Sequence, residues 1–328
     1  MNIVLATSDY YSKPAIVTIK SLLMNNTEEE YLNIYYIENG LSDKSKNDLL
    51  ELVNQNKRSI TFIPMPEELK CISGLMRTNV IAYTYCFFQD ILPGFVEKVL
   101  LIEADTIVVK SLKELYDTDI EDYYLAATDD LQSKFCKEKI GIKENSPYFN
   151  CGVLLLNLKK MRKDKVTEGI KKTIKDGKSK FMYEVQDEMN FFYEGKVKIL
   201  PPKYNFTTAI CLFSYKDMLR YRWPSTCCTE EEFNEAKKDP VIVHFTKNQI
   251  IQSRPWVKDC THPYKNYYLD VMSNTCISDM QLWNSDIKIV NRIVNFIYSK
   301  ISKSLIAWII GSVHAYFYPK YLYRYILK

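Results

Sequence analysis

The sequence predicts an α/β fold in which a mostly parallel β-sheet is flanked by helices. Strand-like and helix-like patterns alternate over the first 110 residues, as in proteins built from βαβ units. Hydrophobic residues make up 47% of the 328 residues, which is enough for a sizeable core. Two carboxylates, Glu103 and Asp105, follow an apolar run, and open α/β sheets bind ligands where their strands end.

The elements of the first half follow from their local patterns. Pro14 stands early in the helical pattern at 13–25, where helices accept proline, and Ser42 offers an N-cap for a helix over 42–56. A third helical pattern covers 78–92 and is closed by Pro93 and Gly94. Short apolar, β-prone runs predict strands at 3–7, 32–37, 60–63 and 99–102.

The second half is more mixed. Apolar runs predict strands at 123–128, 151–158, 197–200 and 241–245. Helical patterns cover 159–176, which Gly177 closes, and 183–193. From 259 to 284 we expect loops with one short helix.

Composition argues against several classes of protein. Only nine glycines occur, and neither GxGxxG nor GxxxxGK[ST] is present, which disfavours dinucleotide-binding and P-loop proteins. Segment 6–11 lacks the glycine-rich basic loop that a nucleotidyltransferase needs. The nine cysteines include no CxxC pair, and no secretory signal precedes the first strand, so we expect reduced thiols and a cytoplasmic protein. Cys227 and Cys228 lack the second ligand pair of a zinc site.

The C-terminal segment is aromatic and basic. Residues 286–328 contain seven basic residues and one acidic residue, interleaved with tyrosine and tryptophan. The apolar run at 305–313 is too short to cross a bilayer. We expect an amphipathic tail on an anionic membrane surface, the alternative being a helix packed on the body. Nucleic-acid binding is not expected, since no domain-wide basic surface accompanies the tail.

The polar residues at strand ends suggest a metal site. In an extended segment, Glu103 and Asp105 would point the same way, and hard cations such as Mg²⁺ and Mn²⁺ favour oxygen ligands. His244 ends an apolar run and could complete the set, although a lone histidine there is more often a core residue. An exposed acidic loop is the alternative for the carboxylates. Gly152 permits the close approach of a ligand or backbone.

Five motifs, in order, resemble family 8 glycosyltransferases, and in layout the bacterial lipooligosaccharide galactosyltransferases of that family. They are the first strand 3–6 followed by Asp9, the acidic pair 103–105, the segment 148–153, Gln186-Asp187 with Asn190, and His244 with the ending 254–256. The resemblance covers residues 2–256. It implies a GT-A fold with a Rossmann-like mixed sheet flanked by helices, and retaining transfer of a hexose from a UDP-sugar.

The resemblance also implies roles for individual residues. Glu103, Asp105 and His244 would hold Mn²⁺, with Mg²⁺ as a second candidate, and the ion would bridge the UDP diphosphate. Gln186 and Asp187 would lie at the transferred sugar, with Gln186 facing the anomeric carbon opposite the leaving group. The neutral amide of Gln186 is a poor nucleophile, which favours a front-face displacement. The remaining donor contacts implied are Ala6, Thr7, Asp9, Asp129, Asp130, Asn150 and Arg254.

Several residues depart from the family pattern. Glu103 replaces an aspartate, Ser8 an acidic uridine contact, Tyr85 an arginine and Val185 an aspartate, and the segment 244–256 is longer than in relatives. These departures keep open a second possibility, a family member that has lost catalysis and serves as a binding or regulatory subunit. A third is a membrane adaptor whose body is a scaffold.

The sequence therefore predicts three regions. A catalytic domain would cover 1–256, a connecting segment 257–287 and a membrane-associating tail 288–328. The acceptor would be a cell-envelope glycan or a lipid-linked glycan at the inner face of the cell membrane. Acceptor contacts are expected on a variable loop at 210–232.

Overall fold

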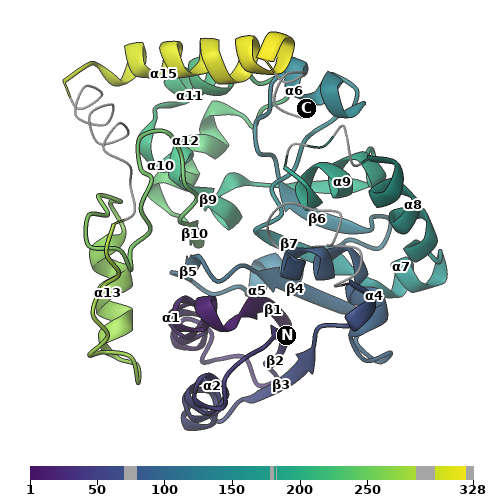
Figure 1. Cartoon of the computed structure of the whole chain (residues 1–328), viewed down its shortest axis with the longest axis vertical. Helices are drawn as coiled ribbons and strands as arrows, with labels where there is room; N and C mark the ends of the chain where they lie inside the picture. Colours follow the sequence, from purple (N-terminus) through teal and green to yellow (C-terminus); the bar gives the residue numbers. More distant parts are fainter. Residues whose placement is uncertain (70–79, 178–180, 182, 286–299, 323–328) are drawn as a thin grey trace.

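A mixed seven-stranded sheet forms the centre of the molecule (Figure 1). The computed structural model describes residues 1–69, 80–177, 181, 183–285 and 300–322. The strand order is β3-β2-β1-β4-β7-β6-β8. The strands are β1 (Asn2–Ser8), β2 (Asn33–Asn39), β3 (Ser59–Pro64), β4 (Lys98–Ile102), β6 (Leu125–Thr128), β7 (Val153–Asn157) and β8 (Val197–Leu200).

The direction of β7 makes the sheet mixed. β3, β2, β1 and β4 run parallel, and β6 is parallel to β8, but β7 is antiparallel to both β4 and β6. The prediction of a mostly parallel sheet is confirmed, since six of the seven strands run in one direction. The one antiparallel strand was not predicted, because an apolar run does not reveal the direction of its strand. The mixed sheet that the family resemblance implies is the one observed.

Helices cover both faces of this sheet. Along β1, Ile3 and Leu5 pack into one core while Val4 and Ala6 pack into the other, as alternating side chains of a strand must. Residues of α1 and α2 join the first core, and residues of α4, α7, α8 and α9 join the second. These helices are α1 (Ser12–Met24), α2 (Asp43–Gln55), α4 (Phe88–Ile91), α7 (Leu158–Lys163), α8 (Thr167–Gly177) and α9 (Val185–Phe192).

A second, three-stranded sheet lies beside the first. β10 (Ile242–His244) pairs antiparallel with β5 (Thr106–Val108) and parallel with β9 (Phe206–Thr207). The 3₁₀ helix η3 (Pro202–Asn205) leads directly into β9. Residues 103–105 are the junction between the sheets, since β4 belongs to the first and β5 to the second. This junction brings Glu103 and Asp105 next to the end of β10.

Two predicted helices differ from those observed. Of the segment 78–92, residues 80–87 form the 3₁₀ helix η2 (Val80–Phe87), in which Thr84 Oγ1 donates to the carbonyl of Ile81, and only α4 is α-helical. Helical spacing does not separate the two helix types. The segment 159–176 is divided into α7 and α8, because Lys165 has a left-handed backbone with φ of 50°.

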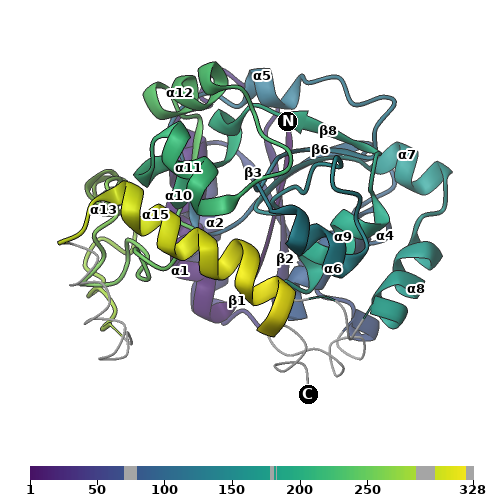
Figure 2. The same ribbon diagram turned by 90° about the horizontal axis from the view of Figure 1, so that it is seen from above.

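The C-terminal elements pack against the body. α15 (Lys303–Gly311) lies along α11 (Tyr215–Arg222), and the π-helix η4 (Ser312–Leu322) lies on α6 (Lys134–Ile140); both views show this arrangement (Figures 1 and 2). Gly311 allows this approach, since a Cβ there would collide with the carbonyl of Arg220. The other helices are η1 (Asp9–Tyr11), α5 (Lys113–Tyr116), α10 (Thr208–Leu212), α12 (Glu230–Lys238) and α13 (Lys265–Ser273).

The tail and the acceptor segment also differ from expectation in detail. Much of 210–232, which was expected to be a loop, is helical in α10 and α11. Residues 288–299 and 323–328 of the predicted tail, and 286–287 of the connecting segment, lie outside the described residues. Buried side chains of α13 and α15 belong to the same core as β1. In the part of the chain that is described, no helix is both long enough and apolar enough to cross a membrane.

Candidate active site

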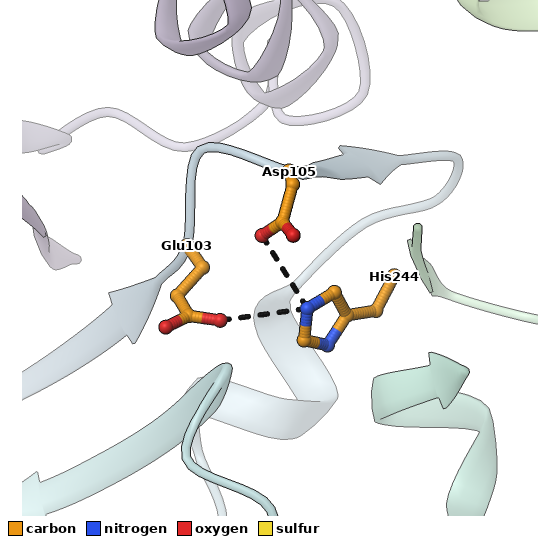
Figure 3. Close-up of side chains that lie close together, drawn as sticks. All are labelled: Glu103, Asp105 and His244. Atoms are coloured by element: carbon orange, nitrogen blue, oxygen red, sulfur yellow. Dashed lines mark ion pairs between the residues drawn. The ribbon is translucent and has the colours of Figure 1, made fainter. Parts of the chain in front are cut away.

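Glu103, Asp105 and His244 converge on one point from two sheets. Nε2 of His244 lies 3.4 Å from Oε2 of Glu103 and 3.4 Å from Oδ1 of Asp105 (Figure 3). One ligand atom from each residue can be chosen so that all lie within 4.8 Å of one another. The arrangement offers two oxygens and one nitrogen around a shared space.

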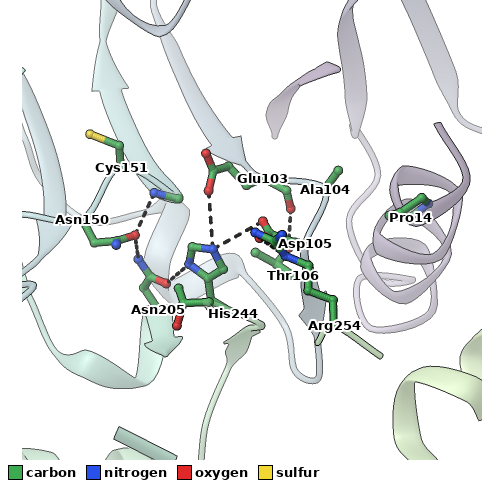
Figure 4. A network of polar contacts seen from close by, with 12 residues as sticks. Pro14, Glu103, Ala104, Asp105, Thr106, Asn150, Cys151, Asn205, His244 and Arg254 are labelled. Atoms are coloured by element: carbon green, nitrogen blue, oxygen red, sulfur yellow. Dashed lines mark hydrogen bonds and ion pairs between the residues drawn. The ribbon is translucent and has the colours of Figure 1, made fainter. Parts of the chain in front are cut away.

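A turn, rather than the extended segment that was expected, aims the two carboxylates. Thr106 Oγ1 donates to the carbonyl of Glu103 at 2.8 Å, which closes the turn. Thr18 Oγ1, on α1, lies 3.0 Å from the carbonyl oxygen of Ala104 and 2.9 Å from that of Thr106. Helix α1 therefore holds the turn at the end of β4, beside the acidic side chains (Figure 4).

Gly152 makes room for this cluster. A Cβ on Gly152 would lie 2.6 Å from Nδ1 of His244 and 3.0 Å from Oε2 of Glu103. The backbone N–H of Glu103 donates to the carbonyl of Gly152 at 2.9 Å, which fixes how close β7 comes to β4. The close approach that the sequence suggested at Gly152 is present, and a larger residue would displace two of the three converging side chains.

Burial and neighbouring charges shift the pKa values of the two carboxylates in opposite directions. Burial, together with Asp105, raises the pKa of Glu103. Burial would also raise the pKa of Asp105, but the positive charge of Arg254 and the contact with His244 outweigh it and hold that pKa below its usual range. Arg254 donates from Nε to Oδ2 of Asp105 at 2.8 Å, and its terminal nitrogen lies 2.5 Å from the same oxygen.

The cluster favours a positive charge at its centre. Burial lowers the pKa of His244, but the nearby Asp105 and Glu103 outweigh burial and raise it. Two carboxylate oxygens and one imidazole nitrogen are also a ligand set that suits Mn²⁺ and Mg²⁺. The side chains present therefore fit a divalent cation, which would satisfy both carboxylates at once.

Asn205 is a site residue that sequence reasoning missed. It belongs to η3, is fully buried, and places Oδ1 2.9 Å from Nδ1 of His244. Its Nδ2 donates to Oδ1 of Asn150 at 2.8 Å. The signal available in the sequence was a single polar residue between Tyr204 and Phe206, just before a short apolar stretch.

A cleft of about 360 Å³ opens next to the acidic cluster. The tip of β1 forms one wall and Arg254 forms another. The hydroxyl of Thr7 is hydrogen-bonded to that of Tyr36 at 2.5 Å, and Tyr11 OH accepts from Arg254 at 3.3 Å. Lining residues include Ala6, Thr7, Ser8, Tyr11, Tyr85 and Arg254, together with Glu103 and Asp105.

Asp130 connects Asn150 to Gln186. Oδ1 of Asp130 accepts from Nδ2 of Asn150 at 3.4 Å, and its Oδ2 accepts from Nε2 of Gln186 at 3.3 Å. Oε1 of Gln186 accepts from the backbone N–H of Cys151 at 3.2 Å. Arg222, on α11, lies 3.7 Å from Oδ1 of Asp130. The amide of Gln186 is thus held at both ends.

The comparisons with known proteins identify the family. The model of the glycosyl transferase family 8 matches residues 2–260. The chain belongs to glycosyltransferase family 8. This family 8 glycosyltransferase is 25% identical to general stress protein A of Bacillus subtilis over 84% of this chain and 94% of that protein. It is also 25% identical to a lipopolysaccharide 1,2-glucosyltransferase of Escherichia coli, over 81% of this chain and 74% of that protein.

A solved structure shows the fold. The galactosyltransferase LgtC, in complex with donor and acceptor sugar analogs, matches with a TM-score of 0.71 and 24% identity. The match covers 84% of this chain and 96% of LgtC. The family 8 glycosyltransferase described here therefore has the GT-A fold.

Three residues that the family resemblance placed at the donor have hydrogen-bond partners within this glycosyltransferase. Oδ1 of Asp9 accepts from the backbone N–H and hydroxyl of Ser42, at the start of α2. Asp129 accepts from Thr226 at 2.8 Å, and burial raises the pKa of Asp129 to about 6. The buried Asp187 accepts from Tyr148 OH at 2.5 Å and from the backbone N–H of Tyr183 at 2.7 Å.

The structure shows the contacts of the residues that depart from the family pattern. Tyr85 OH donates to Oε1 of Glu103 at 3.1 Å, so the longer acidic side chain has a partner in the cleft. Ser8 lines the same cleft. Val185 is buried at the start of α9, in the core that also contains Val4 and Ala6 of β1.

Proposed function

We propose that this family 8 glycosyltransferase transfers a hexose from a UDP-sugar, with retention of configuration and with Mn²⁺, to a cell-envelope glycan. The observation that carries the proposal is the convergence of Glu103, Asp105 and His244 on the rim of a cleft. The tip of β1 lines the same cleft, so a nucleoside diphosphate in it would meet the cation site.

Glu103, Asp105 and His244 would hold Mn²⁺, with Mg²⁺ as the second candidate. When bound, the ion neutralises negative charge on the leaving diphosphate. Oδ1 of Asp105 faces His244 while Oδ2 is occupied by Arg254, so the carboxylate can serve the cation and the guanidinium at once. Arg254 would then extend toward a phosphate oxygen, which its planar fork can bind in a bidentate manner.

The sugar would lie on the side of Gln186 and Asp130. Gln186 is held by Cys151 and Asp130, so its amide is positioned before any substrate arrives. An amide carries no charge and is a weak nucleophile, which supports a front-face displacement over a covalent intermediate. Asn150 and Asp187 would orient the sugar from the strand and helix beside Gln186, while Ala6 and Thr7 would contact the nucleoside.

The acceptor proposed is a lipid-linked or lipopolysaccharide-like glycan at the inner face of the membrane. Lipopolysaccharide 1,2-glucosyltransferases among the relatives support this class of acceptor. The outward side of α15 and η4 exposes a stripe of large apolar side chains that could rest on a membrane surface. We define this tail stripe as Leu305, Trp308, Val313, Phe317 and Tyr321. The division into domain 1–256, connecting segment 257–287 and tail 288–328 belongs to this proposal.

A screen of UDP-sugars for Mn²⁺-dependent hydrolysis and transfer tests the proposal. We expect turnover with one UDP-hexose, and its loss in Glu103→Gln and Asp105→Asn, which keep the side-chain size but remove a charge. Glu121→Gln, at an exposed position that does not line the cleft, serves as the control. UDP binding without turnover would support the catalytically impaired alternative. Turnover that is independent of the metal would contradict the proposed site.

A further inference from the structure

The orientation of Asn150 can be deduced from a backbone donor. The N–H of Gly152 lies 2.9 Å from Oδ1 of Asn150. A backbone N–H can only donate, so the amide oxygen of Asn150, and not its nitrogen, must face Gly152. The same orientation directs Nδ2 of Asn150 toward Oδ1 of Asp130 at 3.4 Å, where a carboxylate accepts. Two independent neighbours thus assign the amide in the same way.

The orientation of Asn205 follows from that of Asn150. The oxygen of Asn150 lies 2.8 Å from Asn205, and an oxygen acceptor requires that Asn205 present its NH₂ group there. The amide oxygen of Asn205 must then face the other way, where Nδ1 of His244 lies at 2.9 Å (Figure 4). The side chain of Asn205 is fully buried, and His244 is 3% exposed, so water does not replace either contact.

We propose that Asn205 is a positioning residue that fixes which nitrogen of His244 carries the ring proton. An amide oxygen has no hydrogen, so Nδ1 of His244 must donate to it. The proton on the neutral ring is then on Nδ1, and the lone pair of Nε2 points at Glu103 and Asp105. This inference rests on the proposed function, because the lone pair matters when a cation occupies the acidic cluster.

The hydrogen bonds from Gly152 through Asn150 and Asn205 disfavour the tautomer of His244 with its proton on Nε2, which the carboxylates alone would favour. With the proton on Nε2, the ring could donate to either carboxylate, but its Nδ1 lone pair would face the oxygen of Asn205 at 2.9 Å. Neither partner would then have a hydrogen to share, and both are buried. The chain from Gly152 through Asn150 and Asn205 therefore keeps Nε2 free to bind a metal. Gly152 serves the site twice, since its missing Cβ also leaves room for the His244 ring.

Three variants separate positioning from packing. Asn205→Leu keeps the shape of the side chain but removes the acceptor for Nδ1. Asn205→Asp retains an oxygen for Nδ1 and is the conservative variant. Asn26→Leu removes another buried asparagine, which holds helix α1 to Leu112 and does not contact the site, and serves as the matched control.

Two measurements apply to each variant. The first is calorimetric titration of UDP into the full chain at a series of fixed Mn²⁺ concentrations, from which the Mn²⁺ affinity follows by linkage. The second is ring ¹⁵N NMR of the metal-free protein, recorded at increasing pH until the His244 shifts are those of a neutral ring; the chain has three histidines, and His244→Gln assigns the relevant signals. We expect Asn205→Leu to weaken Mn²⁺ binding about 10- to 100-fold, as for other partners of metal-binding histidines. Its His244 proton should move from Nδ1 to Nε2.

The other variants and the wild type complete the test. Asn205→Asp should keep the Nδ1 proton, because a carboxylate oxygen still accepts from Nδ1, and Asn26→Leu should change neither quantity. Wild-type His244 with its proton on Nε2 would overturn the inference, as would an Asn205→Leu variant with wild-type Mn²⁺ affinity. Loss of the Nδ1 proton in Asn205→Asp would also overturn it. If the wild type binds no Mn²⁺, the proposed function fails, while the NMR result still decides the position of the proton.

Discussion

Burial and nearby charges determine the pKa of the buried acidic residues of this glycosyltransferase. Glu103 and Asp105 are two residues apart, yet burial raises the pKa of one while Arg254 and His244 lower that of the other. Glu188, on α9, is buried with little to offset its charge.

The sequence identified the residue types at the cluster, because a strand end with two acids is visible in it. It could not identify Asn205 or the pairing with Arg254, which depend on contacts between distant segments.

Glu188 is expected to make stability depend on pH. It is 2% exposed, and one carboxylate oxygen has no partner among the described residues. Burial, reinforced by Asp187 and Glu184, raises its pKa to about 8. The folded state therefore favours the protonated acid, so the stabilisation is present below the unfolded pKa of about 4.3 and is lost as pH rises through about 8.

Glu188→Gln should remove this dependence. The amide imitates the neutral acid, so the variant should exceed wild type in free energy of unfolding by on the order of 3 kcal/mol at pH 8 and by little at pH 4.5. Urea unfolding at both pH values measures the difference, with Glu121→Gln as the exposed control. If the variant were less stable than wild type at pH 8, the charged form of Glu188 would stabilise the fold, which contradicts the prediction.

Gly152→Ala should disable the cation site by crowding. The added Cβ would meet His244 and lie 3.0 Å from Oε2 of Glu103, so both side chains would have to move. We expect Mn²⁺ affinity in the presence of UDP to fall at least tenfold, since a ligand set is sensitive to small displacements. Gly94→Ala, at an open position without nearby atoms, is the control. Unchanged affinity would mean that His244 is not held against Gly152.

The helices and strands show what pattern reasoning can recover. β1, β2, β3 and β4 lie close to their predicted ranges, because the apolar runs are short and bounded by polar segments. The antiparallel direction of β7 and the division between α7 and α8 at Lys165 were missed, since neither follows from hydrophobic spacing. The turn at 103–105 ends one sheet and starts another, and the two apolar runs on either side of it do not reveal that they belong to different sheets.

Contact between α15 and α11 should depend on Gly311. A side chain there would collide with the Arg220 carbonyl and come within 3.0 Å of Nε1 of Trp223. Because backbone atoms cannot move aside cheaply, Gly311→Ala should lower the free energy of unfolding by about 1–3 kcal/mol. Thermal unfolding of Gly311→Ala and of Gly94→Ala provides the comparison. Equal stability of the two variants would indicate that α15 is only loosely associated with the body.

The whole molecule joins a catalytic core and an amphipathic tail in one packed unit. Ile306, Ala307 and Ile310 of α15 lie in the same core as β1, while the tail stripe faces outward. The described part of the tail is therefore a helix packed on the body, which was the alternative expectation, and the exposed tail stripe is the surface for which we propose membrane contact. The five motifs predicted the family. That Glu103, Asp105 and His244 meet across two sheets is seen only in the folded chain.

Membrane association should depend on the outward stripe. Replacing Trp308 and Phe317 by serine leaves the buried side of the tail intact, since both side chains are at least half exposed. We expect the double variant to lose binding to vesicles that contain anionic lipid, measured by sedimentation, because interfacial aromatic side chains anchor amphipathic helices. Phe95→Ser, an exposed aromatic outside the tail, should bind as wild type. Full retention of vesicle binding in the double variant would contradict the role of the stripe.

The central claim is that Glu103, Asp105 and His244 hold a divalent cation for a UDP-sugar. Calorimetric titration of UDP into the full chain, with Mn²⁺ and with chelator, tests it most directly. We predict binding that requires Mn²⁺ in the wild type and is lost in Asp105→Asn. UDP binding of equal strength with and without Mn²⁺ would contradict the claim.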